Sequence, residues 1–97
     1  MVTFQIAGYL TEFAGGRAEI SDNSSPATVG DALGQLWGKH PGLRDRVLNE
    51  QGHVRQHVNV FVNSQVTDRD RVMQMPLKGD AEICIMPAVS GGDSAPE

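Results

Sequence analysis

The sequence predicts an α+β fold in which a mixed sheet of four to five strands is covered on one face by one main helix. Apolar and polar residues alternate near the start of the chain, near residue 60 and near residue 83, which is typical of strands with one buried face. Between the first two of these segments, residues 28–40 repeat apolar positions at helical spacing. Packing that helix on the sheet is the simplest way to bury both apolar faces.

The first 20 residues are predicted to form a β-hairpin. Val2–Ile6 alternates strictly between apolar and polar positions. Gly15 and Gly16 supply the backbone freedom of a turn, and residues 17–20 then alternate again with Ala18 on the apolar side. Residues 21–26 are rich in Ser, Asn and Pro, so we expect a loop there.

One main helix should begin after Thr28. This residue is suited to cap a helix N-terminus, and an acidic side chain in the first turn favours the helix dipole. Gly34 and Gly38 each weaken the helix by about 1 kcal/mol relative to Ala, so packing must stabilise it. Pro41 is expected to end it and to open a shorter helical turn. The apolar stripe of the main helix comprises Val29, Leu33, Leu36 and Trp37.

Two further strands are predicted in the second half, with loops and a short edge strand between them. Residues 57–63 place Val58, Val60 and Val62 on one face, and residues 81–86 place Ile83 and Ile85 on one face. Pro87 is expected to stop ladder pairing. If the two strands pair, the uncovered face of the sheet carries an apolar patch that marks a partner surface. Its members are Phe61, Cys84 and Met86.

Length and composition indicate one domain, residues 1–87, followed by a flexible C-terminal tail, residues 88–97. The 97 residues are 39% hydrophobic and 21% charged, which is close to ordinary globular usage. The net charge is -4 and the Lys and Arg residues are scattered, so we expect neither nucleic-acid nor membrane binding. The single cysteine, Cys84, fits a reducing compartment, and we expect a cytoplasmic protein.

Three segments in this order resemble the ThiS/MoaD-type sulfur-carrier family. They are residues 58–63, residues 78–80 and residues 85–92, and the last of them ends in Gly91 and Gly92. A Gly-Gly pair alone is weak evidence, but here it follows a strand, a proline and a linker of small residues. The resemblance covers residues 1–92 and implies the β-grasp fold of ubiquitin-like proteins.

The resemblance also implies a function that resides in the tail. In the family, a partner adenylyltransferase of the ThiF/MoeB type uses ATP to activate the terminal glycine carboxylate, here that of Gly92, and a sulfur donor converts it to a thiocarboxylate. Gly91 and Ser90 would form the slim approach to the partner's catalytic channel, because glycine adopts backbone angles closed to other residues. The chain would be a co-substrate without a bound cofactor, not an enzyme.

The chain departs from the family pattern because residues follow Gly92. Its carbonyl is in a peptide bond with Asp93, so it cannot be adenylated until that bond is cut. Some relatives are trimmed by a JAMM-type zinc protease, and we expect such a protease to cut between Gly92 and Asp93. The alternatives are that residues 93–97 are not native to the protein, or that this member has lost its carrier function.

The pathway stays open at this point. Residues 43–57 and the ending from Pro87 to Gly92 most resemble carriers that feed cysteine biosynthesis, with a cysteine synthase-like sulfur acceptor. The alternatives are the small subunit of a molybdopterin synthase, a thiamine sulfur carrier and, from another class, a non-catalytic ubiquitin-like binding module. His40, His53 and His57 are not spaced for a closed metal site, so no metal is expected.

Overall fold

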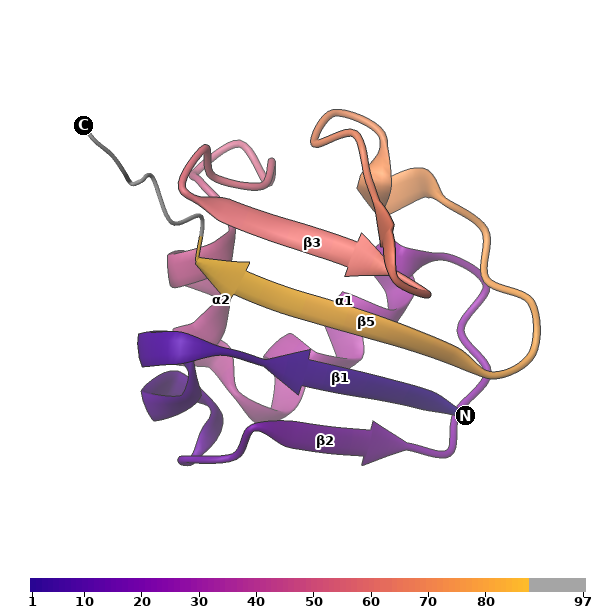
Figure 1. Cartoon of the computed structure of the whole chain (residues 1–97), viewed down its shortest axis with the longest axis horizontal. Helices are drawn as coiled ribbons and strands as arrows, with labels where there is room; N and C mark the ends of the chain where they lie inside the picture. The colour runs from indigo at the N-terminus through magenta and orange to yellow at the C-terminus, as the bar shows by residue number, and fades with distance from the viewer. Residues whose placement is uncertain (88–97) are drawn as a thin grey trace.

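The computed structural model describes residues 1–87, which form a five-stranded mixed sheet with its two α-helices on one face (Figure 1). The predicted α+β architecture is confirmed. The strands are β1 Val2–Ile6, β2 Glu19–Asp22, β3 Val58–Val62, β4 Gln65–Val66 and β5 Ala81–Pro87. The helices are α1 Val29–Lys39 and α2 Pro41–Val47, with 3₁₀ helices η1 Gly8–Ala14 and η2 Val72–Gln74.

The order of the strands places the last strand in the middle of the sheet. The order is β2-β1-β5-β3-β4, in which β5 is parallel to β1 and antiparallel to β3. The remaining neighbours, β1 with β2 and β3 with β4, are antiparallel. β5 pairs with β1 from Ala81 to Ile85 and with β3 from Ile83 to Pro87, so only the ladder with β3 reaches the end of the strand.

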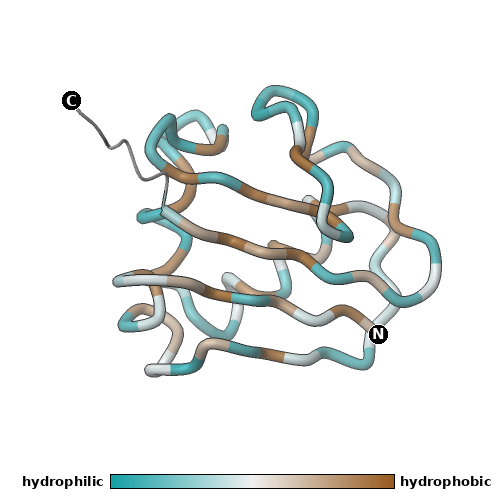
Figure 2. The backbone as a smooth tube through the Cα atoms, in the orientation of Figure 1, coloured by the Kyte–Doolittle hydropathy of each residue, from teal (hydrophilic) through white to brown (hydrophobic). Residues whose placement is uncertain are grey.

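The core lies between the sheet and the helices, and it is built from the apolar positions of the alternating strands. Hydropathy alternates along the strand segments, while most turns are hydrophilic (Figure 2). Full burial of each large apolar side chain contributes about 1.5–3 kcal/mol relative to exposure. The largest fully buried side chains include Phe4, Leu10, Leu33, Leu36, Leu43, Ile83 and Ile85.

Helix α1 begins and packs as its sequence predicts. The Thr28 Oγ1 accepts a hydrogen bond from the backbone N–H of Asp31 at 3.1 Å, which satisfies one of the donors left free in the first turn. Val29, Leu33 and Leu36 are buried, whereas Trp37 is half-buried at the edge of the core. Helix α2 then starts at Pro41. A proline at this position loses no hydrogen bond, because the first backbone N–H groups of a helix have no partner within the helix.

The start of the predicted second strand is wrong by two residues. Strand β2 begins at Glu19 and continues to Asp22, so Ala18 precedes it and is exposed. The connection also holds η1, whose Leu10 and Ala14 are buried under one end of the sheet. Helix η1 takes up residues that a simple turn would have left for the strand, so β2 begins later than predicted. Pairing with β1 then extends β2 to Asp22, into the segment predicted to be a loop.

The predicted end of the last strand, Met86, is one residue too early, because β5 includes Pro87. Pro87 is the last residue of β5 and stands opposite Val58 of β3. The ladder with β1 has already ended at the pair between Ile6 and Ile85. At Pro87 the strand therefore has a neighbour on the β3 side only, and a proline without an N–H is tolerated on such a locally unpaired edge.

Alanine substitution at two glycines of α1 is expected to change the free energy of unfolding in opposite directions. A Cβ on Gly30 would lie 2.7 Å from the backbone oxygen of Met73, so Gly30→Ala must push the segment of η2 away. We expect it to lower the free energy of unfolding by about 1–3 kcal/mol. Gly34→Ala meets nothing within 4 Å and should raise that free energy by about 0.5–1 kcal/mol. Urea unfolding of both variants checks this, and equal effects would contradict the packing of α1 on η2.

Candidate functional site

The end of β5 determines where the tail begins. Pro87 lies at the end of the sheet opposite to Met1, beside the start of η1 (Figure 1). Gly8 opens η1 with a φ of +63°, and a Cβ there would lie 3.0 Å from Pro87 Cγ. A side chain at Gly8 would thus be strained and would displace Pro87, so this glycine is required for the close approach that positions the exit.

The predicted tail, residues 88–97, lies outside the described residues. It contains the predicted sulfur-carrying residue Gly92, its predicted approach Gly91 and Ser90, and Asp93 at the predicted processing site. Chain geometry still limits their reach. Five residues from Pro87 to Gly92 span at most about 18 Å when fully extended. Any group that reacts with Gly92 must come within that distance of the end of β5.

The sheet face opposite the helices carries the three residues predicted to form a partner surface. Phe61 stands opposite Cys84 in the ladder of β3 and β5, and Met86 follows two residues later on the same face. All three are half-buried, whereas their neighbours Val60, Ile83 and Ile85 point into the core. The structure therefore brings together the predicted residues, next to the exit of the tail.

One apolar residue of this face was missed by the sequence prediction. Val66 of β4 stands opposite Phe61 and is 82% exposed, more than any other large hydrophobic side chain of the described chain. The turn before it is a two-residue turn in which Asn63 and Ser64 both have positive φ, and this turn fixes the register. The sequence feature that could have revealed Val66 is the short hairpin, because a two-residue turn after Val62 pairs Val66 with Phe61. We call Phe61, Val66, Cys84 and Met86 the open-face cluster.

The surroundings of the Cys84 thiol in the open-face cluster disfavour its ionised form. Burial raises the pKa of Cys84 above its ordinary value, and the carboxylate of Glu82 on the same face raises it further. Both effects disfavour the thiolate, which is the form that attacks electrophiles and carries sulfur. Cys84 therefore fits an apolar contact residue better than a persulfide carrier.

Replacing this thiol is expected to leave sulfur chemistry intact. In chains ending at Gly92, Cys84→Ala should form thiocarboxylate to the same extent as Cys84 at saturating carrier, because the predicted reactive group is that of Gly92. In the native wild type, iodoacetamide at neutral pH should alkylate Cys84 more slowly than in the same chain unfolded in urea. Alkylation at equal rates, or loss of thiocarboxylate formation in Cys84→Ala, would contradict this assignment.

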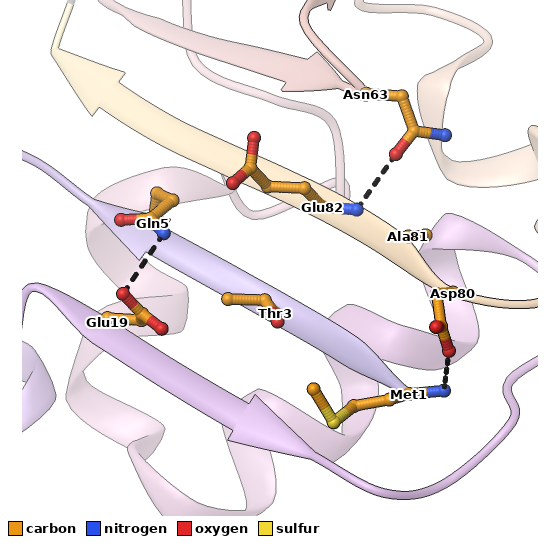
Figure 3. A pocket seen from close by; sticks show the side chains of 8 residues that line it. All are labelled: Met1, Thr3, Gln5, Glu19, Asn63, Asp80, Ala81 and Glu82. Carbon is orange, nitrogen blue, oxygen red and sulfur yellow. Dashed lines mark hydrogen bonds and ion pairs between the residues drawn. The ribbon is translucent and has the colours of Figure 1, made fainter.

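The opposite end of the open face is an acidic hollow of about 430 Å³ (Figure 3). The α-amino group of Met1 donates to Asp80 Oδ1 at 3.0 Å, and Gln5 Nε2 donates to Glu19 Oε1 at 3.4 Å. The Glu82 backbone N–H donates to Asn63 Oδ1 at 2.9 Å. The Glu82 carboxylate lies on the open face. The lining that the structure describes contains no His, Cys, Lys or Arg side chain. It is a polar margin of the open face with three carboxylates and the Met1 ammonium group.

Within residues 1–87, no three His, Cys, Asp or Glu side chains gather closely enough to hold a metal ion. His40, His53 and His57 accordingly do not form a common site in this part of the chain. No helix of the described residues is long and apolar enough to cross a membrane.

Comparison with known proteins agrees with this geometry. The ThiS family model matches residues 4–92, which is nearly the whole chain and ends at Gly92. Small archaeal modifier protein 1 of Haloferax volcanii is 40% identical over 83 residues, covering 86% of this chain and 91% of the relative.

Solved structures share the fold over almost their full length. The crystal structure of SAMP1 from Haloferax volcanii matches with a TM-score of 0.76 and 33% identity, covering 94% of this chain and 98% of that chain. The crystal structure of the Amycolatopsis orientalis BexX/CysO complex contains a chain that matches with a TM-score of 0.80 and 26% identity, covering 95% of this chain and 100% of that chain. The predicted β-grasp fold is thereby confirmed. The chain belongs to the ThiS family of small ubiquitin-like sulfur carriers and modifiers.

Proposed function

We propose that this chain is a sulfur carrier that is trimmed after Gly92 and then thiocarboxylated at the new terminus. The observation that carries the proposal is the end of the family match, which falls at Gly92 and leaves residues 93–97 outside it. A match that stops at the second glycine supports a mature form ending there. The cut between Gly92 and Asp93 suits a JAMM-type zinc protease.

The proposed chemistry needs a free carboxylate and a partner. A carboxylate oxygen of Gly92 attacks the α-phosphorus of ATP on a ThiF/MoeB-type adenylyltransferase, and pyrophosphate leaves. Hydrosulfide then attacks the acyl carbon, AMP leaves with the carboxylate oxygen, and one proton is released. The product is a thiocarboxylate, so the chain acts as a co-substrate whose partners supply ATP, sulfur and catalytic groups.

The open-face cluster supports a docking role in this reaction. It lies on the face free of helices and continues to Met86, next to the exit at Pro87. A partner seated on this cluster has its active site within reach of Gly92, since the tail spans at most about 18 Å. Aromatic residues and methionine are enriched in protein interfaces, which fits Phe61 and Met86 of this cluster.

Cysteine biosynthesis is the pathway we favour, with a cysteine synthase-like enzyme as the sulfur acceptor. The support is the similarity to the CysO chain of the BexX/CysO complex, together with the residues 43–57 and the Pro87-to-Gly92 ending. Thiamine and molybdopterin synthesis are the competing uses. Transfer of labelled sulfur from the thiocarboxylated chain to cysteine, with no transfer to a thiazole or pterin acceptor, would support the choice.

A second function, covalent protein modification, is favoured by one observation. Two relatives at 40% identity are named small archaeal modifier proteins. Activation at Gly92 serves this function equally, because an acyl adenylate can also be attacked by a lysine amine to form an isopeptide. A tagged chain expressed in its own cells separates the two functions. Carrier function predicts free thiocarboxylated chain, whereas modifier function predicts tagged species of higher mass that disappear when Gly92 is deleted.

A further inference from the structure

A small cavity lies at the outer edge of β3, beside the open-face cluster. Its volume is about 80 Å³, roughly half that of a cavity that admits benzene, so it has room for about three to four carbon atoms. The cavity is bordered by Phe61 and Val66 of the open-face cluster and by Arg69. The remaining lining is mostly valine: Val54, Val58, Val60 and Val72, with Asn59 and Thr67.

The cavity exists because strand β4 is very short. β4 pairs with only Phe61 and Val62, so the outer edge of β3 before Phe61 has no neighbouring strand. Side chains from the following loop bind the edge carbonyls instead. Thr67 Oγ1 donates to the Val60 oxygen at 2.6 Å, and Arg69 Nη2 donates to the Val58 oxygen at 2.9 Å. These contacts hold the loop at the edge and leave the cavity beneath it.

Arg69 brings a positive charge to the cavity that the described chain does not neutralise. Its Nε donates to the Arg55 oxygen at 3.1 Å, and its Nη2 also contacts the Gln56 oxygen and Asn59 Oδ1, all of which are neutral acceptors. Among residues 1–87, no carboxylate forms an ion pair with Arg69, and no acceptor is bound to its Nη1. The guanidinium is thus held by its Nε and Nη2, while residues 1–87 supply no hydrogen-bond acceptor to its Nη1.

We propose that this cavity and Arg69 form a recognition site for the adenylyltransferase, which inserts an aliphatic side chain and places an Asp or Glu carboxylate on Arg69 Nη1. The proposal rests on the proposed carrier function. An aliphatic group matches the valine lining and the volume, and a carboxylate matches the uncompensated charge. The site is continuous with the open-face cluster through Phe61 and Val66, so one partner surface can cover both.

The test is the KM for the carrier in adenylation, measured with chains ending at Gly92 and the adenylyltransferase of the same cells. Arg69→Gln should raise KM roughly tenfold, as expected for loss of one charge-assisted contact, with kcat at saturation unchanged. Arg71→Gln removes the same charge from an exposed neighbour and should change KM by no more than about twofold. The KM of the wild type should also rise with salt more steeply than that of Arg69→Gln.

Because Arg69 also holds the loop at the edge of β3, its replacement could act through the loop. Val66→Asp is a second variant that leaves the contacts of Arg69 in place. Val66 is exposed, and a carboxylate there should repel the partner's carboxylate and raise KM without lowering the melting temperature. If Arg69→Gln is folded and matches Arg71→Gln, or if Val66→Asp leaves KM unchanged, the proposal is overturned. If the wild-type chain ending at Gly92 is not adenylated, both the proposed function and this recognition site are refuted. That result is distinct from the previous two, in which the wild type is adenylated.

Discussion

A chain that keeps its residues after Gly92 is expected to gain no sulfur, whereas the same chain ending at Gly92 is expected to be converted to the thiocarboxylate. The reason is chemical, since an amide carbonyl offers no carboxylate oxygen to attack ATP. The two forms differ only in residues 93–97, so the folded domain and its docking surface are identical. Mass spectrometry after incubation with ATP, sulfide and the adenylyltransferase measures the difference, which should be complete within detection.

Two controls separate trimming from other causes of inactivity. Addition of the JAMM-type protease to the longer chain should restore conversion, and this restoration should be lost when the zinc is chelated. Gly92→Val in the chain ending at residue 92 should block conversion although a carboxylate is present, because a branched side chain does not enter a channel suited to glycine. Thiocarboxylate on the untrimmed chain would refute the trimming step.

Replacing Phe61 by threonine is expected to raise the KM of adenylation by roughly thirtyfold, the effect of losing an interface contact worth about 2 kcal/mol. Threonine is β-branched and therefore also favours strand β3, while it removes the aromatic ring from the open-face cluster. Because the ring is half-buried, a modest loss of stability should accompany the change.

Phe13→Thr is the matched control for this loss of stability. Phe13 is likewise half-buried, but it lies in η1, where its ring is 4.5 Å from the Arg46 guanidinium. Its replacement should lower the melting temperature to a similar degree and leave KM unchanged. Equal effects of the two variants on KM would show that stability, not the open-face cluster, determines recognition.

The regular elements could be predicted from the sequence because local and tertiary preferences agree in them. In Val2–Ile6 and Val58–Val62 the alternation coincides with one buried face, and Thr28 caps α1 as expected. The fold was predicted less well where tertiary contacts decide. The helix η1 is held by burial of Leu10 and Ala14 rather than by a strong local signal, and its presence shifts β2.

The candidate site was predictable to the extent that it depends on strand pairing. Phe61 and Cys84 fall on one face by alternation alone, and pairing of β3 with β5 brings them together. Arg69 belonged to a run of alternating charges that indicated a solvated loop. Its contacts with the edge carbonyls of β3 arise only because β4 ends after two residues, a tertiary effect that the charge pattern does not contain.

The sheet relates the proposed docking surface to the start of the tail. β5 lies between β1 and β3 and ends at Pro87, beside Met86 of the open-face cluster. In the proposed function, a partner bound to this cluster would meet Gly92 within about 18 Å of the end of β5. The catalytic groups would then come from that partner.

The most direct test of carrier function is the intact mass of the protein purified from its native cells, before and after incubation with ATP, sulfide and its adenylyltransferase. We expect a chain ending at Gly92 that exchanges one oxygen for one sulfur. A chain that retains Asp93 and gains nothing would contradict carrier function and would favour a non-catalytic ubiquitin-like binding module.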